Sequence, residues 1–274
     1  MVVAPAYRAD VEAVLARRHD NGADLWATPD GRLIKGSPFT TLDCARLLVD
    51  LGVGPDEPVL RDVAALILST WREDGRFRLA PGTVFPCQTI NAARTLAYLG
   101  HADDPRLTVT FDQLLACRHT DGGWRCAKFF FGRGPETESS NPGPTLAALD
   151  AFRFTGHTDE LDGAVELLLS HWETRAPLGP CHYGIGTLFM QVTYPFGAYN
   201  LLFWVYVLSF YERARGDARF LDALGALERA TRDGEVVVQR PHAKLAALNA
   251  FRAGEPSDLA TARYREILAN LGRA

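Results

Sequence analysis

Apolar positions recur along most of the chain at intervals of three and four residues, the period of an α-helix with one buried face. In residues 87–100, for example, Ile90, Ala93 and Leu96 fall on one side of such a helix. The pattern comes in five pairs, each an apolar helix, a short polar turn and a second amphipathic helix. The pairs are residues 40–52 with 56–73, 87–100 with 104–119, 144–156 with 159–175, 199–216 with 219–232, and 244–254 with 257–271.

Glycine closes the first segment of every pair. A helix commonly ends with one residue in the left-handed region, where a Cβ atom is unfavourable. The closing residues are Gly52, Gly100, Gly156, Gly216 and Gly254. Asp, Ser or Pro then stands near the start of the second segment, as is typical of helix N-termini. The sequence therefore predicts five helical hairpins over residues 37–274, preceded by an N-terminal helix and a connecting segment over residues 1–36.

The first segments are the more apolar members of the pairs. Residues 201–208 are apolar on every side, which is typical of a helix that is buried all round. This difference predicts an inner layer made of the first helices and an outer layer made of the second. Strand-like stretches are few, residues 235–239 being the clearest, so we expect one all-α domain over residues 1–274.

Three of the second segments end in a recurring Asp-Gly tag, at residues 73–77, 120–124 and 232–236. The middle copy, which runs from Leu114 to Trp124, resembles the glutamine–tryptophan repeat of squalene and oxidosqualene cyclases, with His119 where glutamine is expected. The hairpin pattern covers roughly residues 40–271. The resemblance implies the α/α toroid (barrel) of the terpenoid cyclase and prenyltransferase superfamily, with inner and outer helix layers.

The catalytic signatures of that superfamily are not matched. The nearest approach to the Asp-x-Asp-Asp acid of the cyclases, residues 101–104, lacks the first aspartate and is better explained as a helix N-cap. Neither the Asp-Asp-x-x-Asp magnesium motif nor the Asp-x-Cys zinc pair of protein prenyltransferases occurs. The resemblance therefore implies a shared fold with different chemistry.

Thiols and imidazoles gather where first helices begin. If these helices line a toroid, their starts converge at one rim, and thiolate and neutral imidazole are the usual zinc ligands. The predicted zinc ligands are Cys87, Cys126, Cys181 and His182, with His242 as a substitute. The alternative is that these residues are buried thiols and capping histidines. Cys44 and Cys117 are predicted to lie in the core.

The longest irregular segment, residues 129–144, is a second source of candidate chemistry. Glu136 and Glu138 are candidate acid and base, Arg133 a candidate ligand for an anionic group, and Phe131 a candidate substrate contact. The alternative is a solvated loop whose Asn141 caps the next helix. Residues 129–131 are all phenylalanine, and we expect part of the loop to fold inward, because three exposed rings favour aggregation.

Aromatic residues are frequent between residues 183 and 206. Tyr183 and Tyr199 are candidate orienting groups, and Tyr194, Phe196 and Trp204 are candidates for the apolar wall of a ligand cavity. Such rings stabilise carbocations through cation–π attraction. The alternative is that they are core packing.

Composition narrows the function classes. The chain has 274 residues and a net charge of -4, so no basic excess favours nucleic acid. Neither a secretory signal nor an apolar run long enough for a membrane span is found, and a cytoplasmic location with reduced cysteines is expected. The first hypothesis is an isoprenoid-type enzyme that acts on an apolar small molecule, with zinc as a possible cofactor. The alternatives are a non-catalytic binding protein for a hydrophobic molecule or peptide, and a zinc hydrolase on the same scaffold.

Overall fold

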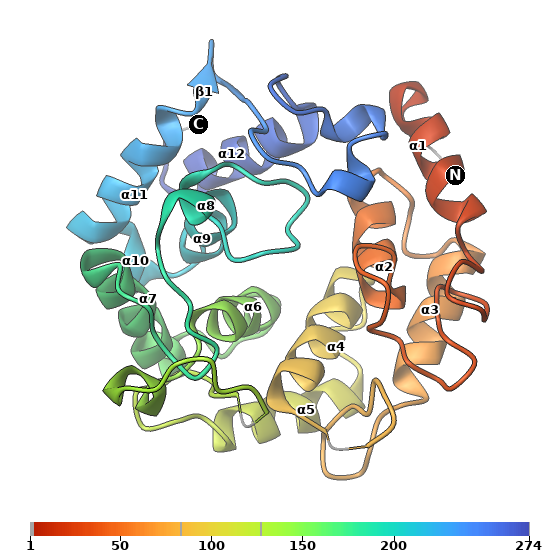
Figure 1. Ribbon diagram of the computed structural model, residues 1–274, viewed down its shortest axis with the longest axis horizontal. Helices are drawn as coiled ribbons and strands as arrows, with labels where there is room; N and C mark the ends of the chain where they lie inside the picture. Colours follow the sequence, from red (N-terminus) through yellow and green to blue (C-terminus); the bar gives the residue numbers. More distant parts are fainter. Residues whose placement is uncertain (1–2, 83, 127, 274) are drawn as a thin grey trace. The chain divides into compact units, whose positions relative to one another are not determined.

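The computed structural model describes residues 3–82, 84–126 and 128–273 (Figure 1). Half of the chain is helical and 4% is strand, which confirms the predicted class as a mostly helical fold. The chain divides into two compact units. Unit 1 comprises Met1–Cys117 and Ala247–Ala250, and unit 2 comprises Arg118–Ala246 and Phe251–Ala274. Within the described ranges, no helix combines the length and the apolarity needed to cross a bilayer.

Unit 1 contains the N-terminal helix and the first two predicted hairpins. Its helices are η1 (Pro5–Tyr7), α1 (Arg8–Ala16), α2 (Thr41–Asp50), α3 (Pro58–Leu68), α4 (Pro86–Tyr98) and α5 (Pro105–Ala116). Proline is the first residue of α3, α4 and α5, where its missing N–H has no helical partner to lose. Thr40 caps α2 and Asp104 caps α5 through their side-chain oxygens. The sequence signals for helix starts therefore act here as predicted.

Unit 2 contains the third and fourth hairpins and the last helix. Its elements are η2 (Pro135–Glu138), α6 (Pro142–Phe152), η3 (Asp159–Leu161), α7 (Asp162–Thr174), α8 (Thr187–Met190), α9 (Leu201–Leu208), α10 (Glu212–Arg215), α11 (Ala218–Glu228), β1 (Thr231–Arg232), β2 (Glu235–Val236), η4 (Ala243–Leu245) and α12 (Asp258–Asn270). The short helix η5 (Asn249–Phe251) spans the boundary of the two units. All eight residues of α9 are buried, as its uniformly apolar sequence predicts.

Each unit is built by packing helical hairpins side by side. In unit 1, α4 packs on α5, its hairpin partner, and also on α2 and α3 of the preceding hairpin. In unit 2, α6 packs on α7 and on α9, while α7 packs on α11. First helices thus contact first helices, and in unit 2 second helices contact second helices. These contacts join neighbouring hairpins within each unit.

The Asp-Gly tags form one recurring tie between a hairpin and a later helix. In each copy the glycine has a positive φ, and the residue two places later is buried: Phe77, Trp124 or Val236. The backbone N–H of that buried residue donates to a buried threonine hydroxyl. The pairs are Phe77 with Thr89 (3.2 Å), Trp124 with Thr145 (3.1 Å) and Val236 with Thr261 (2.9 Å). Each threonine is the fourth residue of its helix, α4, α6 or α12.

Two of these tags also need glycine for close packing. A Cβ atom on Gly75 would lie 2.8 Å from the carbonyl oxygen of Val109 in α5, and one on Gly122 would lie 2.7 Å from the backbone of Gly163 in α7. No atom lies within 4 Å of the same position on Gly234. The backbones of the first two tags therefore approach the second helix of the next hairpin closely, α5 for Gly75 and α7 for Gly122.

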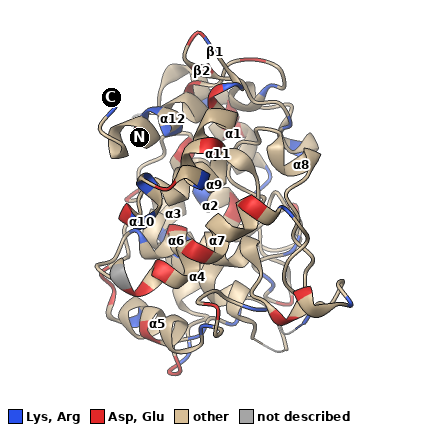
Figure 2. Ribbon diagram, turned by 90° about the vertical axis from the view of Figure 1, so that its left-hand side faces the viewer, with Lys and Arg blue, Asp and Glu red and all other residues tan. Residues whose placement is uncertain are grey.

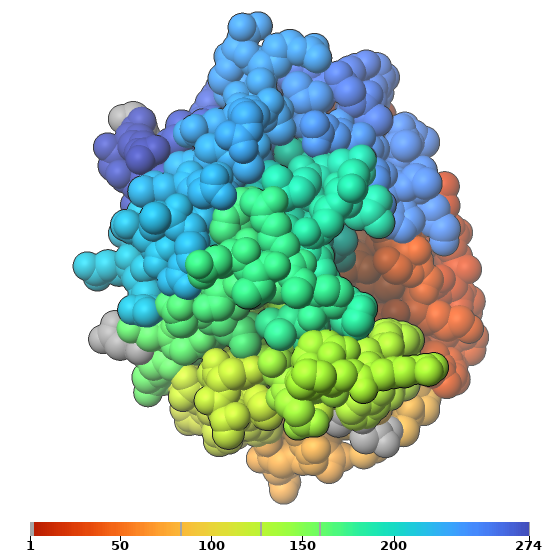
Figure 3. All heavy atoms as spheres, turned by 60° about the vertical axis from the view of Figure 1, so that its left-hand side comes forward, coloured from red at the N-terminus to blue at the C-terminus, as the bar shows by residue number. Residues whose placement is uncertain are grey.

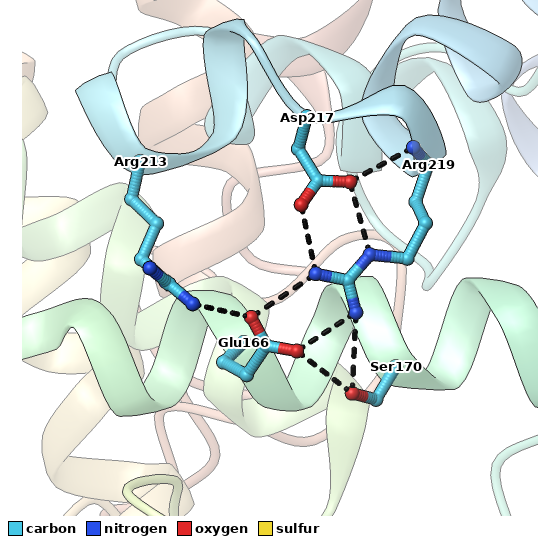
Figure 4. A network of polar contacts seen from close by, with 5 residues as sticks. All are labelled: Glu166, Ser170, Arg213, Asp217 and Arg219. Atoms are coloured by element: carbon cyan, nitrogen blue, oxygen red, sulfur yellow. Dashed lines mark hydrogen bonds and ion pairs between the residues drawn. The ribbon is translucent and has the colours of Figure 1, made fainter.

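Acidic and basic positions are interspersed over the side drawn in Figure 2. One charged cluster joins three helices of unit 2 (Figure 4): Glu166 of α7 accepts hydrogen bonds from Arg219 of α11 (2.7 Å) and Arg213 of α10 (2.8 Å). Asp217, the N-cap of α11, holds the same Arg219 guanidinium at 2.8 Å. The hydrogen bonds from Arg219 lower the pKa of Glu166, and those from Arg213 and Ser170 lower it further. Together they outweigh partial burial, which raises it, and bring the pKa to about 2.

Two expectations are corrected. Residues 244–254 form the short 3₁₀ helices η4 and η5 and no α-helix, so the fifth hairpin lacks its first member. The backbone N–H groups of Asn249 and Ala250 donate to the carboxylate of Asp10 (2.9 and 2.8 Å) instead of to helical carbonyls. Cys44 is buried as predicted, but Cys117 is exposed, because it is the C-cap at the end of α5.

Candidate functional site

The predicted zinc ligands are distributed over both units. Cys87 is the second residue of α4 in unit 1, and the other four belong to unit 2. The Cys126 sulfur accepts the backbone N–H of Lys128 at 3.4 Å. Nδ1 of His242 accepts the N–H of Lys244 at 3.2 Å and caps η4, the role that the alternative interpretation gave to histidine.

These side chains do not make a zinc centre as they stand. Among the described residues, no three His, Cys, Asp or Glu side chains come together in a group that could hold a metal ion. A tetrahedral structural site takes four protein ligands, and a catalytic site three. Zinc binding therefore stays a prediction.

Glu136 and His182 come together, although they are 46 residues apart by subtraction of their numbers. Nδ1 of His182 lies 3.8 Å from Oε1 of Glu136. The same oxygen accepts the backbone N–H groups of Gly134 (3.1 Å) and Arg133 (3.2 Å). These bonds, the one from Gly134 foremost, lower the pKa of Glu136, so it is a carboxylate at neutral pH. It can therefore accept a proton or hold a cation.

Gly132 makes this arrangement possible. It is buried, and a Cβ atom there would lie 2.7 Å from Oε1 of Glu136 and 3.1 Å from Nδ1 of His182. Glu138, the other predicted carboxylate, is 79% exposed and lies 3.8 Å from Arg125. The structure thus brings Glu136 into the cluster with His182 and leaves Glu138 at the surface.

Asn141 holds the two loops of this region together. It is fully buried at the N-cap of α6, but its side chain makes no capping bond. Its Oδ1 instead accepts the N–H of Cys181 at 2.9 Å. Nδ2 of Asn141 is buried and has no hydrogen-bond partner in the part of the chain that the structure describes. Two backbone bonds join the same loops, from Gly179 to the Glu136 carbonyl (2.9 Å) and from Phe131 to the Pro180 carbonyl (2.8 Å).

Tyr183 and Tyr199 form a pair in the same region of unit 2. Their rings meet edge to face with centroids 5.6 Å apart, and both side chains are half-buried. The Tyr183 ring covers Gly143, where a Cβ atom would lie 2.5 Å from a ring carbon. Burial raises the pKa of the Tyr199 hydroxyl well above its usual value. The polar side-chain interaction with Trp204 lowers this pKa, but by less. Tyr199 is therefore a neutral phenol at neutral pH.

His171 of α7 is the polar partner of Tyr199, and the sequence did not single it out. Its Nε2 donates to the carbonyl oxygen of Ala176 (3.0 Å), so Nδ1 is left to accept the Tyr199 hydroxyl (2.8 Å). Burial lowers the pKa of His171, while its hydrogen bonds to backbone raise it by less. The lowered pKa favours the neutral ring. The only sequence signal was a histidine on the apolar face of a predicted helix, which is common in cores.

The Tyr199 ring continues into a buried aromatic group. The centroid of the Phe189 ring, in α8, lies 4.8 Å from that of Tyr199. Trp172 packs next to Phe189, and the centroids of the Trp172 and Trp204 rings lie 5.5 Å apart. Nε1 of Trp204 is buried, and no acceptor among the described residues meets it at hydrogen-bond geometry. Tyr194 and Phe196 pack in a second group, 5.0 Å apart, and both are buried. Among the predicted aromatic contacts in these two groups, Tyr183 and Tyr199 are the two that remain partly accessible.

The expectation for the phenylalanine run is wrong. Phe129, Phe130 and Phe131 are exposed by 46%, 59% and 67%, so none of them folds into the core. The backbone bond from Phe131 to Pro180 holds this stretch against the neighbouring loop, which leaves its side chains outside. Arg133, the predicted anion ligand, is also exposed.

In comparisons with known proteins, the chain matches no protein-family model and no curated protein.

Proposed function

We propose that this protein binds an apolar, isoprenoid-type molecule against the tyrosine pair of unit 2 and transforms it as a prenyltransferase-like or terpenoid cyclase-like enzyme. The observation that carries the proposal is the half-buried pair Tyr183 and Tyr199, backed by Phe189, Trp172 and Trp204. Small-molecule sites combine such apolar, aromatic walls with a few polar groups that fix orientation. His171 and Tyr199 supply one such polar group.

The chemical step would use the same residues. Aromatic faces attract a cation, so the ring of the neutral Tyr199 would stabilise an adjacent carbocation through cation–π attraction. Glu136 and His182, 3.8 Å apart, are the groups that would accept or hold a proton. No step passes through a metal. A carrier function without turnover is the second candidate, favoured by the lack of any cyclase acid motif.

The α/α toroid is part of this proposal. Within each unit, neighbouring hairpins pack first helix on first helix, and the Asp-Gly tags repeat one tie to the next hairpins. A scaffold of this kind places inner-helix starts and their loops at one rim. The loops that hold Tyr183, Glu136 and Asn141 are of this class, since they precede α6 and α9.

The test combines binding and turnover. Titration with farnesyl diphosphate, geranylgeranyl diphosphate and squalene should quench the fluorescence of Trp172 and Trp204 saturably for at least one compound. Tyr183→Ala should weaken that binding about tenfold, because it removes a large apolar contact. Tyr98→Ala, a half-buried tyrosine at the end of α4, is the control and should leave binding unchanged.

Mass spectrometry of the incubated mixtures decides between enzyme and carrier. New products that disappear with Glu136→Gln support the enzyme. Saturable binding with unchanged compounds supports the carrier. Equal affinity of wild type and Tyr183→Ala, or no binding of any of the three compounds, contradicts the placement of the site.

A further inference from the structure

The segment 128–133, the phenylalanine loop, presents an apolar tip on the surface of unit 2. The exposed fractions of its three rings rise along the loop from 46% to 67%. Figure 3 shows the yellow-green segment that contains it as a ridge on the face drawn. Contiguous exposed apolar groups of this kind mark interaction sites in proteins.

Two rings of this loop stack on each other, and all three are exposed. Phe129 and Phe131 stack nearly parallel with centroids 5.6 Å apart, so they lie on one side of the backbone. Phe130 stands between them in the chain and is 59% exposed. A fluid apolar phase can surround each of these exposed rings, whatever its direction.

The backbone of the loop is held in place beneath these rings. The N–H of Phe131 donates to the carbonyl oxygen of Pro180 at 2.8 Å, and Gly132 is buried against Glu136 and His182. The tip is therefore presented by a fixed support, and the rings do not need to leave a buried site before they bind.

Cationic side chains stand at both ends of the loop. The Lys128 ammonium lies 5.0 Å from the centre of the Phe129 ring, and Arg133 follows the tip. The nearby acidic groups are engaged elsewhere: Glu136 faces backbone N–H groups and His182, and Glu138 faces Arg125. Phenylalanine between Lys and Arg matches the boundary of a bilayer, where acyl chains lie beneath anionic phosphates.

We propose that the phenylalanine loop docks this protein on the surface of an anionic lipid bilayer. Phe129, Phe130 and Phe131 enter the boundary between headgroups and acyl chains, and Lys128 and Arg133 contact lipid phosphates. The net charge of -4 opposes attraction of the whole chain to such a surface, so attachment depends on this loop. Residues 128–133 make the contact with lipid, whereas Tyr183 and Tyr199 would contact the apolar molecule, so vesicle binding and ligand binding can fail separately.

Sedimentation of the full-length protein with vesicles tests the proposal. The vesicles contain phosphatidylcholine with one-fifth phosphatidylserine, and pure phosphatidylcholine vesicles serve for comparison. We expect binding to the mixed vesicles, weakened about tenfold by Phe131→Ser, because each ring is removed from water on insertion. Leu221→Ser, at a 37% exposed leucine of α11, is the matched control and should bind like wild type. Lys128→Gln combined with Arg133→Gln should reduce binding to mixed vesicles more than to neutral ones.

A reporter at the tip measures insertion directly. Phe130→Trp should shift its emission to shorter wavelength on mixed vesicles and be quenched by brominated acyl chains, and Leu221→Trp should do neither. Three results overturn the proposal: no vesicle binding, equal binding of wild type and Phe131→Ser, or a Phe130→Trp emission that vesicles leave unchanged. A dimer that Phe131→Ser dissociates, together with absent vesicle binding, identifies a second copy as the occupant instead.

Discussion

The backbone N–H of Trp124 is buried, and the hydroxyl of Thr145 is its acceptor at 3.1 Å. Valine has nearly the shape of threonine but offers no acceptor. A buried donor that loses its partner costs the free energy of its lost hydration, about 1–3 kcal/mol. Thr145→Val should therefore lower the free energy of unfolding by about that amount, measured by urea denaturation. Thr174→Val, at an exposed threonine that ends α7, is the control and should change it by less than about 0.5 kcal/mol. Equal losses in both variants would mean that the tie contributes nothing.

The element scale shows which parts of the fold could be predicted. Periodic apolar positions and caps located α2–α7, α11 and α12 closely, because both signals act within a few residues. The segment predicted over residues 199–216 is instead divided into α9 and α10. These local signals could not predict that the fifth hairpin lacks its first helix. The N–H groups of Asn249 and Ala250 donate to the carboxylate of Asp10, which is far away in the sequence. The same holds at the candidate site: Asn141 with Cys181, and His171 with Tyr199, are pairs made by tertiary folding. The exposure of the phenylalanine run was also beyond these local signals, since the rule that exposed rings are unfavourable does not include the backbone bond from Phe131 to Pro180, which joins this loop to another.

The charged contact between α7, α10 and α11 makes the stability of these elements depend on pH. The pKa of Glu166 falls from 4.5 to about 2 on folding, so the folded state holds its proton less tightly than the unfolded state. The stabilisation is fully present above about pH 4.5 and is lost as the pH falls toward 2. Glu166→Gln removes this difference. Its free energy of unfolding should fall less steeply than that of wild type between these pH values, while at pH 7 it should be lower by only about 0.2–1 kcal/mol, as for exposed ion pairs.

Urea denaturation at stepped pH values measures this difference. Glu173→Gln changes an exposed glutamate of the same helix and should follow the wild-type curve. Parallel curves for wild type and Glu166→Gln would show that the contact does not hold Glu166 ionised.

At the scale of the whole molecule, the first helix and a segment near the end of the chain belong to one compact unit. Asp10 of α1 is 2% exposed, and its two carboxylate oxygens accept the N–H groups of Asn249 and Ala250, 239 and 240 residues away. Asp10→Ala would remove this acceptor from the buried N–H of Ala250 and the partly buried N–H of Asn249, or force η5 to open, at about 1–3 kcal/mol for a buried group and less for a partly buried one. We expect the free energy of unfolding to fall by about 2–4 kcal/mol, and hydrogen exchange at Asn249 and Ala250 to accelerate more than at the amides of α9. Glu12→Ala changes an exposed carboxylate of the same helix and should do neither. If Asp10→Ala exchanges at these two amides like wild type, another contact must hold the segment, and the loss of the fifth hairpin's first helix would need a different cause.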